Sequence, residues 1–297
     1  MSKQSREQLT QAQARTLARL DQVRTHFEQH PASGRFRNKV GIVTGTGSLK
    51  GIGRATTRLL AREGAKALYV LDFDGSTLDA FADELQKKHP GLKVTAITGD
   101  AADTALIQSV CERAKQEHGR LDLFFANAGT TGSNLVLDTT DEDGVMDVMR
   151  VNLLSCFVAV KHASKVMKEN PPEAAGGSII LTASAGPMDY SASKAGVINL
   201  ATTAASNLAG TNIRVNAICP GLIETGMTTY TFDRARERGT LGKVGQLNPL
   251  RRFGIAEEIA QAALFLASDD SSYVNGVALP VDGGLSSSLP VVPGQTM

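Results

Sequence analysis

Two side chains in the second half of the sequence could carry acid–base chemistry. Tyr190 and Lys194 are four residues apart, and on a helix this spacing places both on one face. A free tyrosine has a pKa of about 10 and exchanges protons poorly at neutral pH. A neighbouring ammonium group would stabilise the phenolate and bring this pKa closer to the working pH. The pair is a candidate proton donor and acceptor, although the same spacing also arises by chance.

A glycine-rich stretch further upstream predicts a dinucleotide-binding loop. It lies between a β-branched run and a helix-like segment, which is the required context for such a loop. Its glycines would permit a tight turn and let the backbone approach a pyrophosphate at the helix N-terminus. The residues predicted to make this contact are Gly45, Gly47, Lys50, Gly51, Ile52 and Gly53.

Two charged residues bear on the choice of nucleotide. Asp72 ends the next predicted strand, where a carboxylate accepts hydrogen bonds from the ribose hydroxyls of NAD and repels the 2′-phosphate of NADP. Lys50 directly precedes Gly51, where a cation could instead meet that phosphate. We expect NAD as the cofactor, with NADP as the alternative. Taken singly, Asp72 also fits a helix cap and Lys50 a solvated loop residue.

These residues need a scaffold, and the apolar pattern predicts one. From residue 38 onward, short apolar runs alternate with helix-like segments, which indicates a parallel sheet covered by helices on both faces. The expected strands are 40–44, 67–71, 93–97, 121–126, 178–182, 213–218 and 277–281. The expected helices are 53–62, 76–88, 103–117, 141–168, 189–208 and 256–268. The fold class is therefore α/β: a doubly wound, Rossmann-like parallel sheet in three α/β/α layers, formed by one domain over 36–297.

Residues 1–35 differ from the rest of the chain. One face of an amphipathic helix is formed there by Leu9, Ala12, Thr16, Leu20, Val23 and Phe27. Pro31 and Gly34 would end this helix. Recurring arginines fit a transit peptide, but Glu7, Asp21 and Glu28 argue against one. We expect a helical arm that packs on the body or on a neighbouring subunit, and a substrate lid at about 226–249.

The composition excludes several classes of protein. The 297 residues contain 31 Lys+Arg and 30 Asp+Glu, and a net charge of +1 lacks the basic surplus of a nucleic-acid binder. The 3 cysteines are widely spaced, which disfavours a disulfide framework and fits a reducing compartment, so we expect a cytoplasmic protein. No apolar run approaches the roughly 18 residues of a membrane span. The histidines show no ligand spacing beyond His26 and His30, so no metal site is expected.

Over roughly 37–285, the sequence resembles the short-chain dehydrogenase/reductase family. The glycine loop, Tyr190 and Lys194 occur in the family's order, together with an N-A-G motif, a strand-terminal serine and a P-G turn. The resemblance implies that the catalytic residues are Asn152, Ser184, Tyr190 and Lys194. It adds further cofactor contacts at Asp100, Ala101, Asn127, Ala128, Gly129, Pro220, Ile223 and Thr225, with Tyr190 and Lys194 also touching the cofactor.

This resemblance implies an NAD(P)-dependent oxidoreductase that interconverts a secondary alcohol and a ketone or related carbonyl by hydride transfer. Tyr190 would exchange a proton with the substrate oxygen, and Ser184 would hydrogen-bond that oxygen. Lys194 would bind the nicotinamide ribose and depress the pKa of Tyr190. Asn152 would hold a water molecule in the proton relay.

The sequence departs from the family pattern at two places. The glycine loop is two residues longer than the family's T-G-x-x-x-G-x-G, so either Gly45 or Gly47 could play the first glycine. Only residues 185–189 separate Ser184 from Tyr190, a shorter segment than is usual, which would widen the substrate pocket or displace Ser184. The alternative is therefore a protein of this fold with altered or lost redox chemistry, such as an isomerase, a cyclase or a cofactor-binding protein.

The family commonly pairs subunits through helices that correspond to 141–168 and 189–208. Apolar residues available for such pairing are Val145, Val148, Val151, Phe157 and Val160. We therefore expect a homotetramer or homodimer that acts on a small alcohol or carbonyl substrate. Neither a nucleic acid nor a membrane is expected as a partner.

Overall fold

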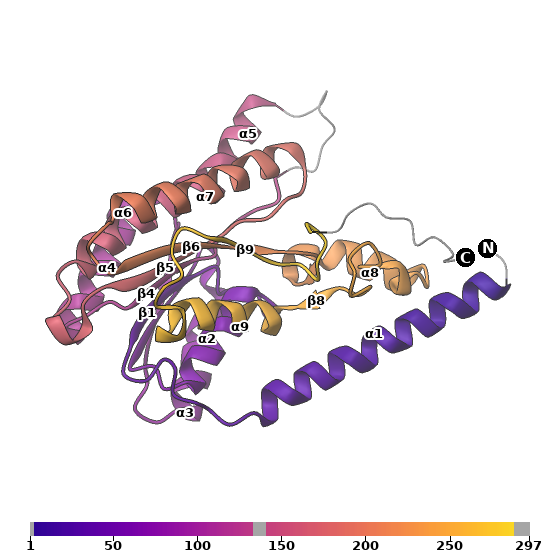
Figure 1. Ribbon diagram of the computed structural model, residues 1–297, viewed down its shortest axis with the longest axis horizontal. Helices are drawn as coiled ribbons and strands as arrows, with labels where there is room; N and C mark the ends of the chain where they lie inside the picture. Colours follow the sequence, from indigo (N-terminus) through magenta and orange to yellow (C-terminus); the bar gives the residue numbers. More distant parts are fainter. Residues whose placement is uncertain (1–2, 133–140, 288–297) are drawn as a thin grey trace.

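Seven parallel strands form one sheet at the centre of the protein, in a computed structural model that describes residues 3–132 and 141–287 (Figure 1). The strand order is β3-β2-β1-β4-β5-β6-β9. Successive strands are added in one direction from β1 to β3 and in the opposite direction from β4 to β9, so the order switches between β1 and β4. The strands are β1 Val40–Thr44, β2 Ala67–Asp72, β3 Lys93–Thr98, β4 Leu123–Ala126, β5 Gly177–Thr182, β6 Ile213–Pro220 and β9 Ala278–Val281. Two short strands, β7 Ile223–Glu224 and β8 Gly254–Ile255, pair with each other outside this sheet. The predicted doubly wound α/β class is confirmed.

Helices cover both faces of the sheet (Figure 1). The helices are α1 Lys3–Gln29, α2 Ile52–Arg62, α3 Leu78–Lys88, α4 Thr104–His118, α5 Glu142–Met149, α6 Ser155–Met167, α7 Met188–Asn207, α8 Thr229–Glu237 and α9 Ala256–Ala267. Shorter 3₁₀ turns are η1 Gly75–Thr77, η4 Pro172–Ala174, η5 Gly226–Thr228, η6 Leu241–Lys243 and η7 Asp269–Ser271.

Neighbouring residues of β1 point into different cores, as the twofold period of a strand requires. Ile42 packs in a core formed with α4, α6 and α7, to which Ile107 and Val197 contribute. Val43 packs in the opposite core with α2, α3 and α9, which includes Phe81 and Ile259. Because both faces of the sheet are buried, the strands read as nearly continuous apolar runs rather than as alternating ones.

The long helical stretch expected over 141–168 is confirmed, and it contains one irregular turn that was not predicted. A π-helical turn, η3 Arg150–Leu154, lies between α5 and α6. In a π turn each backbone hydrogen bond spans five residues instead of four, so the turn holds one extra residue. One extra residue is too small a change to be recognised from the spacing of apolar residues in the sequence. The turn is the segment that carries Asn152, which it turns into the protein interior, fully buried.

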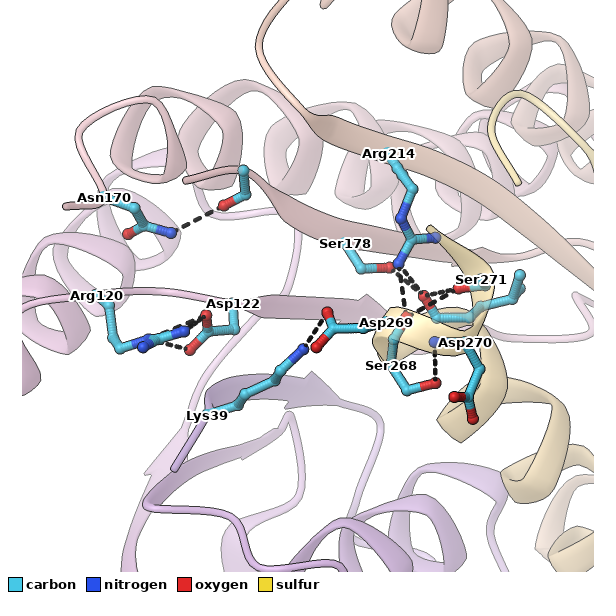
Figure 2. Close-up of polar contacts among 12 residues, drawn as sticks. Lys39, Arg120, Asp122, Asn170, Ser178, Arg214, Ser268, Asp269, Asp270 and Ser271 are labelled. Carbon is cyan, nitrogen blue, oxygen red and sulfur yellow. Dashed lines mark hydrogen bonds and ion pairs between the residues drawn. The ribbon is translucent and has the colours of Figure 1, made fainter. Parts of the chain in front are cut away.

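Paired charges occupy the amino ends of the strands, opposite the edge that carries the predicted site (Figure 2). The Lys39 ammonium binds the Asp269 carboxylate at 2.6 Å, and Arg120 Nε binds Asp122 Oδ2 at 2.8 Å. The Arg214 guanidinium donates to the carbonyl of Leu266 at 2.8 Å, at the carboxyl end of α9. These bonds surround a hollow of about 740 Å³. These bonds hold the loops at the amino ends of the strands against the sheet, while the predicted site residues lie at the carboxyl ends.

Candidate active site

The predicted site residues gather at the carboxyl ends of the sheet strands, next to the reversal between β1 and β4. In open α/β sheets, ligands bind at this edge and at this kind of reversal. Gly45 directly follows β1, Asn127 follows β4 and Ser184 follows β5 by two residues. Asp72 ends β2 and Pro220 ends β6. Parallel pairing thus brings together residues that lie far apart in the sequence.

Tyr190 and Lys194 lie in the first turns of α7, both facing the protein. The Tyr190 side chain is 9% exposed and Lys194 is 2% exposed. The Lys194 ammonium nitrogen lies 5.6 Å from the centre of the Tyr190 ring. It donates a hydrogen bond of 2.7 Å to the backbone carbonyl of Thr182, at the end of β5. The lysine therefore joins the helix to the strand that carries Ser184.

The pKa of Tyr190 differs from the expectation. Burial raises the pKa of the Tyr190 phenol, and the hydrogen bond with Ser184 opposes this rise without cancelling it. Burial also lowers the pKa of Lys194. The shift of the Tyr190 pKa is therefore upward, opposite to the direction predicted from its neighbour Lys194. The physical reason is that removing both groups from water disfavours their charged forms, which are the forms that would attract each other.

Ser184 stays within reach of Tyr190 despite the short segment between them. The Ser184 hydroxyl acts on the Tyr190 phenol, where it opposes the rise in pKa, and it donates a hydrogen bond of 3.3 Å to the carbonyl oxygen of Pro220. The short segment forms a compact turn in which the Ser191 hydroxyl bonds both the amide and the carbonyl of Gly186, at 2.9 and 2.7 Å. A Cβ at Gly186 would come within 2.9 Å of the Tyr190 ring. The absence of a side chain there lets the short turn fit beside the Tyr190 ring.

Asn152 is fully buried, and its side chain bonds Thr130 and Ser193. Its Oδ1 accepts from the Thr130 amide at 2.8 Å. Its Nδ2 donates to the Thr130 carbonyl at 2.9 Å and to Ser193 Oγ at 3.1 Å. A Cβ at Gly129 would lie 3.1 Å from Asn152 Oδ1 and 3.4 Å from Lys194 Nζ. The backbone after β4 thus passes directly over Asn152 and the lysine.

The glycine loop leaves the N-terminus of α2 available for an anion. Gly51 occupies the N-cap position, and among the described residues no side chain caps this helix. Its first amides therefore point outward with the positive end of the helix dipole, as a pyrophosphate site requires. Gly45 has a φ of +74°, and a Cβ there would lie 2.8 Å from Asn127 Nδ2. These constraints are those of a tight turn that requires glycine at position 45, whereas Gly47 has a separate contact.

That contact joins the extra residues of the loop to Asp72. The Gly47 amide donates to Asp72 Oδ2 at 2.7 Å, and the Asp74 amide donates to Oδ1 at 3.1 Å. The carboxylate is half-buried and fixed in place, with lone pairs left for a ribose. The predicted cation Lys50 is exposed and lies 3.9 Å from Glu224 of β7.

Sequence reasoning missed Arg54, a buried residue of α2 that binds the backbone of the glycine loop. This residue is 3% exposed, and its Nε donates to the Thr46 carbonyl at 3.1 Å. Its terminal nitrogen donates to Thr77 Oγ1 at 2.8 Å, and Thr77 Oγ1 in turn donates to the Gly47 carbonyl at 2.8 Å. The guanidinium stacks 4.2 Å from the centre of the Phe81 ring. An arginine in the first turn of an amphipathic helix reads as a surface residue, so no sequence signal marked it.

The remaining predicted cofactor residues lie around this edge. Asn127 Nδ2 donates to the carbonyls of Thr44 and Gly45, each at 3.2 Å, which ties β4 to β1. Asp100 is bound by the Ala102 amide at 2.8 Å and by Arg150 at 2.5 Å, so part of its charge is balanced within the protein. The residues whose backbones line the same edge are Ile52, Gly53, Ala101, Ala128 and Gly129. Ile223 is buried in β7, and the buried Thr225 directly follows that strand and forms a capping box with Thr228.

Comparison with known proteins agrees with this geometry. The family profile described as Enoyl-(Acyl carrier protein) reductase matches residues 45–286. The 3-oxoacyl-(acyl-carrier-protein) reductase FabG of Thermotoga maritima is 41% identical over 258 residues, which cover 84% of this chain and 99% of the relative. Levodione reductase of Leifsonia aquatica is 34% identical over 264 residues, covering 86% of this chain and 96% of the relative. A crystal structure of levodione reductase matches with a TM-score of 0.77 at 33% identity, over 86% of this chain and 100% of that chain.

The chain belongs to the short-chain dehydrogenase/reductase family, and the resemblance seen in the sequence is confirmed. It is an oxidoreductase of the kind that uses a nicotinamide dinucleotide, NAD(P). Among the described residues, no helix is long and apolar enough to cross a membrane. Over the same residues, no group of three or more His, Cys, Asp or Glu side chains could hold a metal ion.

Proposed function

We propose that the protein reduces the carbonyl group of a small ketone, or oxidises the matching secondary alcohol, with Tyr190 as the acid or base. The observation that carries this proposal is the joint placement of Tyr190, Ser184, Lys194 and Asn152 at one edge of the sheet. A bound nicotinamide would supply or accept the hydride. The two named relatives are both reductases, which supports reduction as the working direction.

The raised pKa of Tyr190 fits the acid role. A phenol whose pKa is raised by burial stays protonated at neutral pH, so it can donate a proton to a carbonyl oxygen that gains charge. Ser184 would donate a hydrogen bond to the same oxygen, since its hydroxyl already lies beside the phenol. When a carbonyl compound is bound, these two hydroxyl groups would hold its oxygen between them.

Lys194 and Asn152 would act next to the reacting groups. The Lys194 ammonium has one described hydrogen bond, to the Thr182 carbonyl, and ammonium groups have three protons to donate. A second proton could therefore bind a ribose hydroxyl of the cofactor. Asn152 would order a water molecule in a relay between Lys194 and solvent. Because both Nδ2 protons already bind Thr130 and Ser193, this water would donate to Oδ1, which lies beside the Gly129 backbone that also borders the lysine.

NAD is the cofactor we propose. Asp72 is fixed by two backbone amides at the end of β2, so it cannot swing away from a 2′-phosphate. Lys50 lies near Glu224, and a carboxylate partner reduces the benefit of placing that cation on a phosphate. NADP stays the alternative, and a comparison of kcat/KM for the two cofactors decides between them.

The rival of lost redox chemistry is not favoured by the site. One of its two grounds was a displaced Ser184, and the Ser184 hydroxyl still acts on the Tyr190 phenol, where it opposes the rise in pKa. The other ground, a wider substrate pocket, keeps this reading as the alternative. We also propose that the body of residues 36–297 acts as one domain in which residues 226–249 close over the substrate.

We further propose that the protein forms a homodimer or homotetramer through α5, α6 and α7. Phe157 of α6 is 51% exposed and Met146 of α5 is 64% exposed, which leaves an apolar surface for a second copy. Val148, expected on this surface, is instead buried in the subunit. Mass photometry that finds only monomers at micromolar concentration would contradict this assembly.

The decisive experiment is the variant Tyr190→Phe. It removes the proton-exchanging oxygen and keeps the ring that packs in the site. We expect carbonyl reduction to fall to background, while the dissociation constant of NADH, measured by fluorescence, changes less than about twofold. Tyr273→Phe is the matched control because Tyr273 is fully exposed and lies near the amino ends of the strands, away from the candidate site. Retained turnover in Tyr190→Phe would refute the assigned role.

A further inference from the structure

Helix α1 lies outside the layers of the sheet (Figure 1) and contacts η6 of the 226–249 segment. Leu20 is 1% exposed and Val23 is 7% exposed, although both lie on a helix outside the sheet layers. They belong to a separate apolar cluster with Phe232 of α8, Leu241 of η6 and residues around β8. Within this cluster, the rings of Phe232 and Phe253 meet edge to face at 4.8 Å.

The first half of α1 touches the same segment through its backbone. A Cβ at Gly242 would lie 2.4 Å from the Leu9 carbonyl oxygen and 3.3 Å from the Gln13 amide nitrogen. Only a glycine permits this approach, because any larger residue would push η6 and α1 apart. The contact between arm and segment is therefore close-packed along the helix from Leu9 to Val23.

The other end of the arm is fastened to α2, in the body of the protein. The Arg62 side chain donates to the carbonyl of Phe27, the last apolar residue of α1. Glu63, which is 1% exposed, accepts hydrogen bonds from the amides of Ser33 and Arg35, both at 3.1 Å. The arm thus spans from α2 to the 226–249 segment and connects them by packing on both.

The segment held by α1 leads directly to the candidate site. Arg236 of α8 pairs with Glu224 of β7, and Glu224 lies 3.9 Å from Lys50 in the glycine loop. A Cβ at Gly226 would lie 2.4 Å from Ser48 Oγ, so the start of the segment touches the same loop. The family profile matches 45–286, so α1 lies outside the part of the chain that the family shares.

We propose that α1 is a positioning element for the substrate side of the active site: it braces α8 and η6 and thereby sets the affinity for the substrate. The proposal rests on the proposed function, in which residues 226–249 cover the substrate. The glycine loop is held independently by Arg54 and Asp72. Loosening α1 should therefore weaken substrate binding and leave cofactor binding nearly unchanged.

The test compares Leu20→Ser with Leu17→Ser in the full-length protein. The two leucines lie one turn apart on α1, but Leu17 is 46% exposed and Leu20 only 1%. We expect Leu20→Ser to speed hydrogen–deuterium exchange of residues 229–243 by at least about tenfold, because the packing that opposes local opening is lost. Its KM for a carbonyl substrate should rise several-fold, with kcat and the NADH dissociation constant within about twofold of the parent. Leu17→Ser should match the parent in every measurement.

A second variant guards against a general loss of folding. Gly242→Ala adds one methyl group that meets the Leu9 carbonyl and removes no apolar contact. It should give the same faster exchange of 229–243 and the same rise in KM, while exchange in β1, β4 and β5 stays at the parental rate. Unchanged exchange and KM in both variants would overturn the proposal, as would a loss of protection spread evenly over the sheet.

Failure of this proposal can be told apart from failure of the proposed function. The exchange measurement needs no substrate, so it reports on the brace even if no carbonyl compound is reduced. If Tyr190→Phe lacks an effect but Leu20→Ser still opens 229–243, the chemistry is wrongly assigned and α1 is a brace of a different site. That outcome would overturn the link to substrate affinity made here.

Discussion

The Gly47 amide donates a hydrogen bond of 2.7 Å to Asp72 Oδ2, so the lengthened glycine loop is tied to the end of β2. The tie holds a carboxylate where the ribose of a dinucleotide would lie. It also explains how the loop accommodates its extra residues, because the Gly47 amide among them is bonded to the Asp72 carboxylate and is not left in solvent. Because the position of the Asp72 carboxylate is fixed, its negative charge should decide between NAD and NADP.

The variant Asp72→Asn tests this point, because asparagine keeps an acceptor for the Gly47 amide and removes the charge. We expect kcat/KM with NADPH to rise by about tenfold or more, since one unfavourable charge pair near the protein surface is worth at least about 1.4 kcal/mol. Asp79→Asn, an exposed carboxylate on α3, is the control. A variant that still rejects NADPH as strongly as the parent would show that another feature sets the preference.

Ser184 should contribute to the chemical step. Ser184→Ala removes a hydroxyl that would stabilise charge on the substrate oxygen, and we expect kcat to fall by about ten- to a thousandfold. Ser184→Thr keeps the hydroxyl and should recover much of the activity. A negligible effect of the alanine variant, measured by steady-state kinetics, would mean that the short turn leaves the hydroxyl unable to reach the substrate.

The pH dependence should follow from the raised pKa of Tyr190. Reduction needs the protonated phenol, and a group with a raised pKa keeps its proton until a higher pH. We therefore expect kcat/KM for reduction to stay level between about pH 7 and 9, and that for alcohol oxidation, which needs the phenolate, to rise about tenfold per pH unit. A reduction rate that already falls near neutral pH would show that cofactor binding brings Lys194 into play and lowers the Tyr190 pKa.

Arg54 should matter for cofactor binding although it lies under the loop rather than beside the ligand. Arg54→Met keeps an apolar side chain over Phe81 and loses the bonds to Thr46 and Thr77. Hydrogen bonds to charged groups contribute about 1.5–3 kcal/mol, so we expect the NADH dissociation constant to rise at least about tenfold.

Arg58→Met is the matched control for this substitution. Arg58 reaches the same Phe81 ring at 5.2 Å, but it pairs with Glu84 on the surface and touches no part of the loop. It should bind NADH like the parent. Equal effects of the two variants, measured by titration of NADH fluorescence, would place the role of Arg54 in folding rather than in holding the loop.

The strands and most helices could be predicted from the sequence because buried parallel strands are apolar runs and their helices are amphipathic. The expected strand 40–44, for example, coincides with β1 Val40–Thr44. Tyr190 and Lys194 could be paired from their spacing alone, because one helix carries both. The order of motifs then placed Asn127, Ser184 and Pro220 at one edge of the sheet.

Other features carry no signal in a single sequence. The π turn at Arg150–Leu154 changes backbone hydrogen bonds without changing the apolar period. The partner of Lys194 is the Thr182 carbonyl, a backbone atom that every residue has. The pKa of Tyr190 depends on how deeply α7 packs, which spacing does not measure. For α1, the sequence pattern predicted the apolar face with Leu20 and Val23, but it did not indicate that this face packs against α8 and η6.

The docking of α1 also affects how the protein should be produced. Leu9 lies against Gly242, and Lys3 begins the helix only about 9 Å further along its axis, at 1.5 Å per residue. A purification tag fused ahead of this helix would be tethered beside the 226–249 segment, the proposed cover of the substrate. Kinetic constants are therefore best measured on protein from which such a tag has been cleaved.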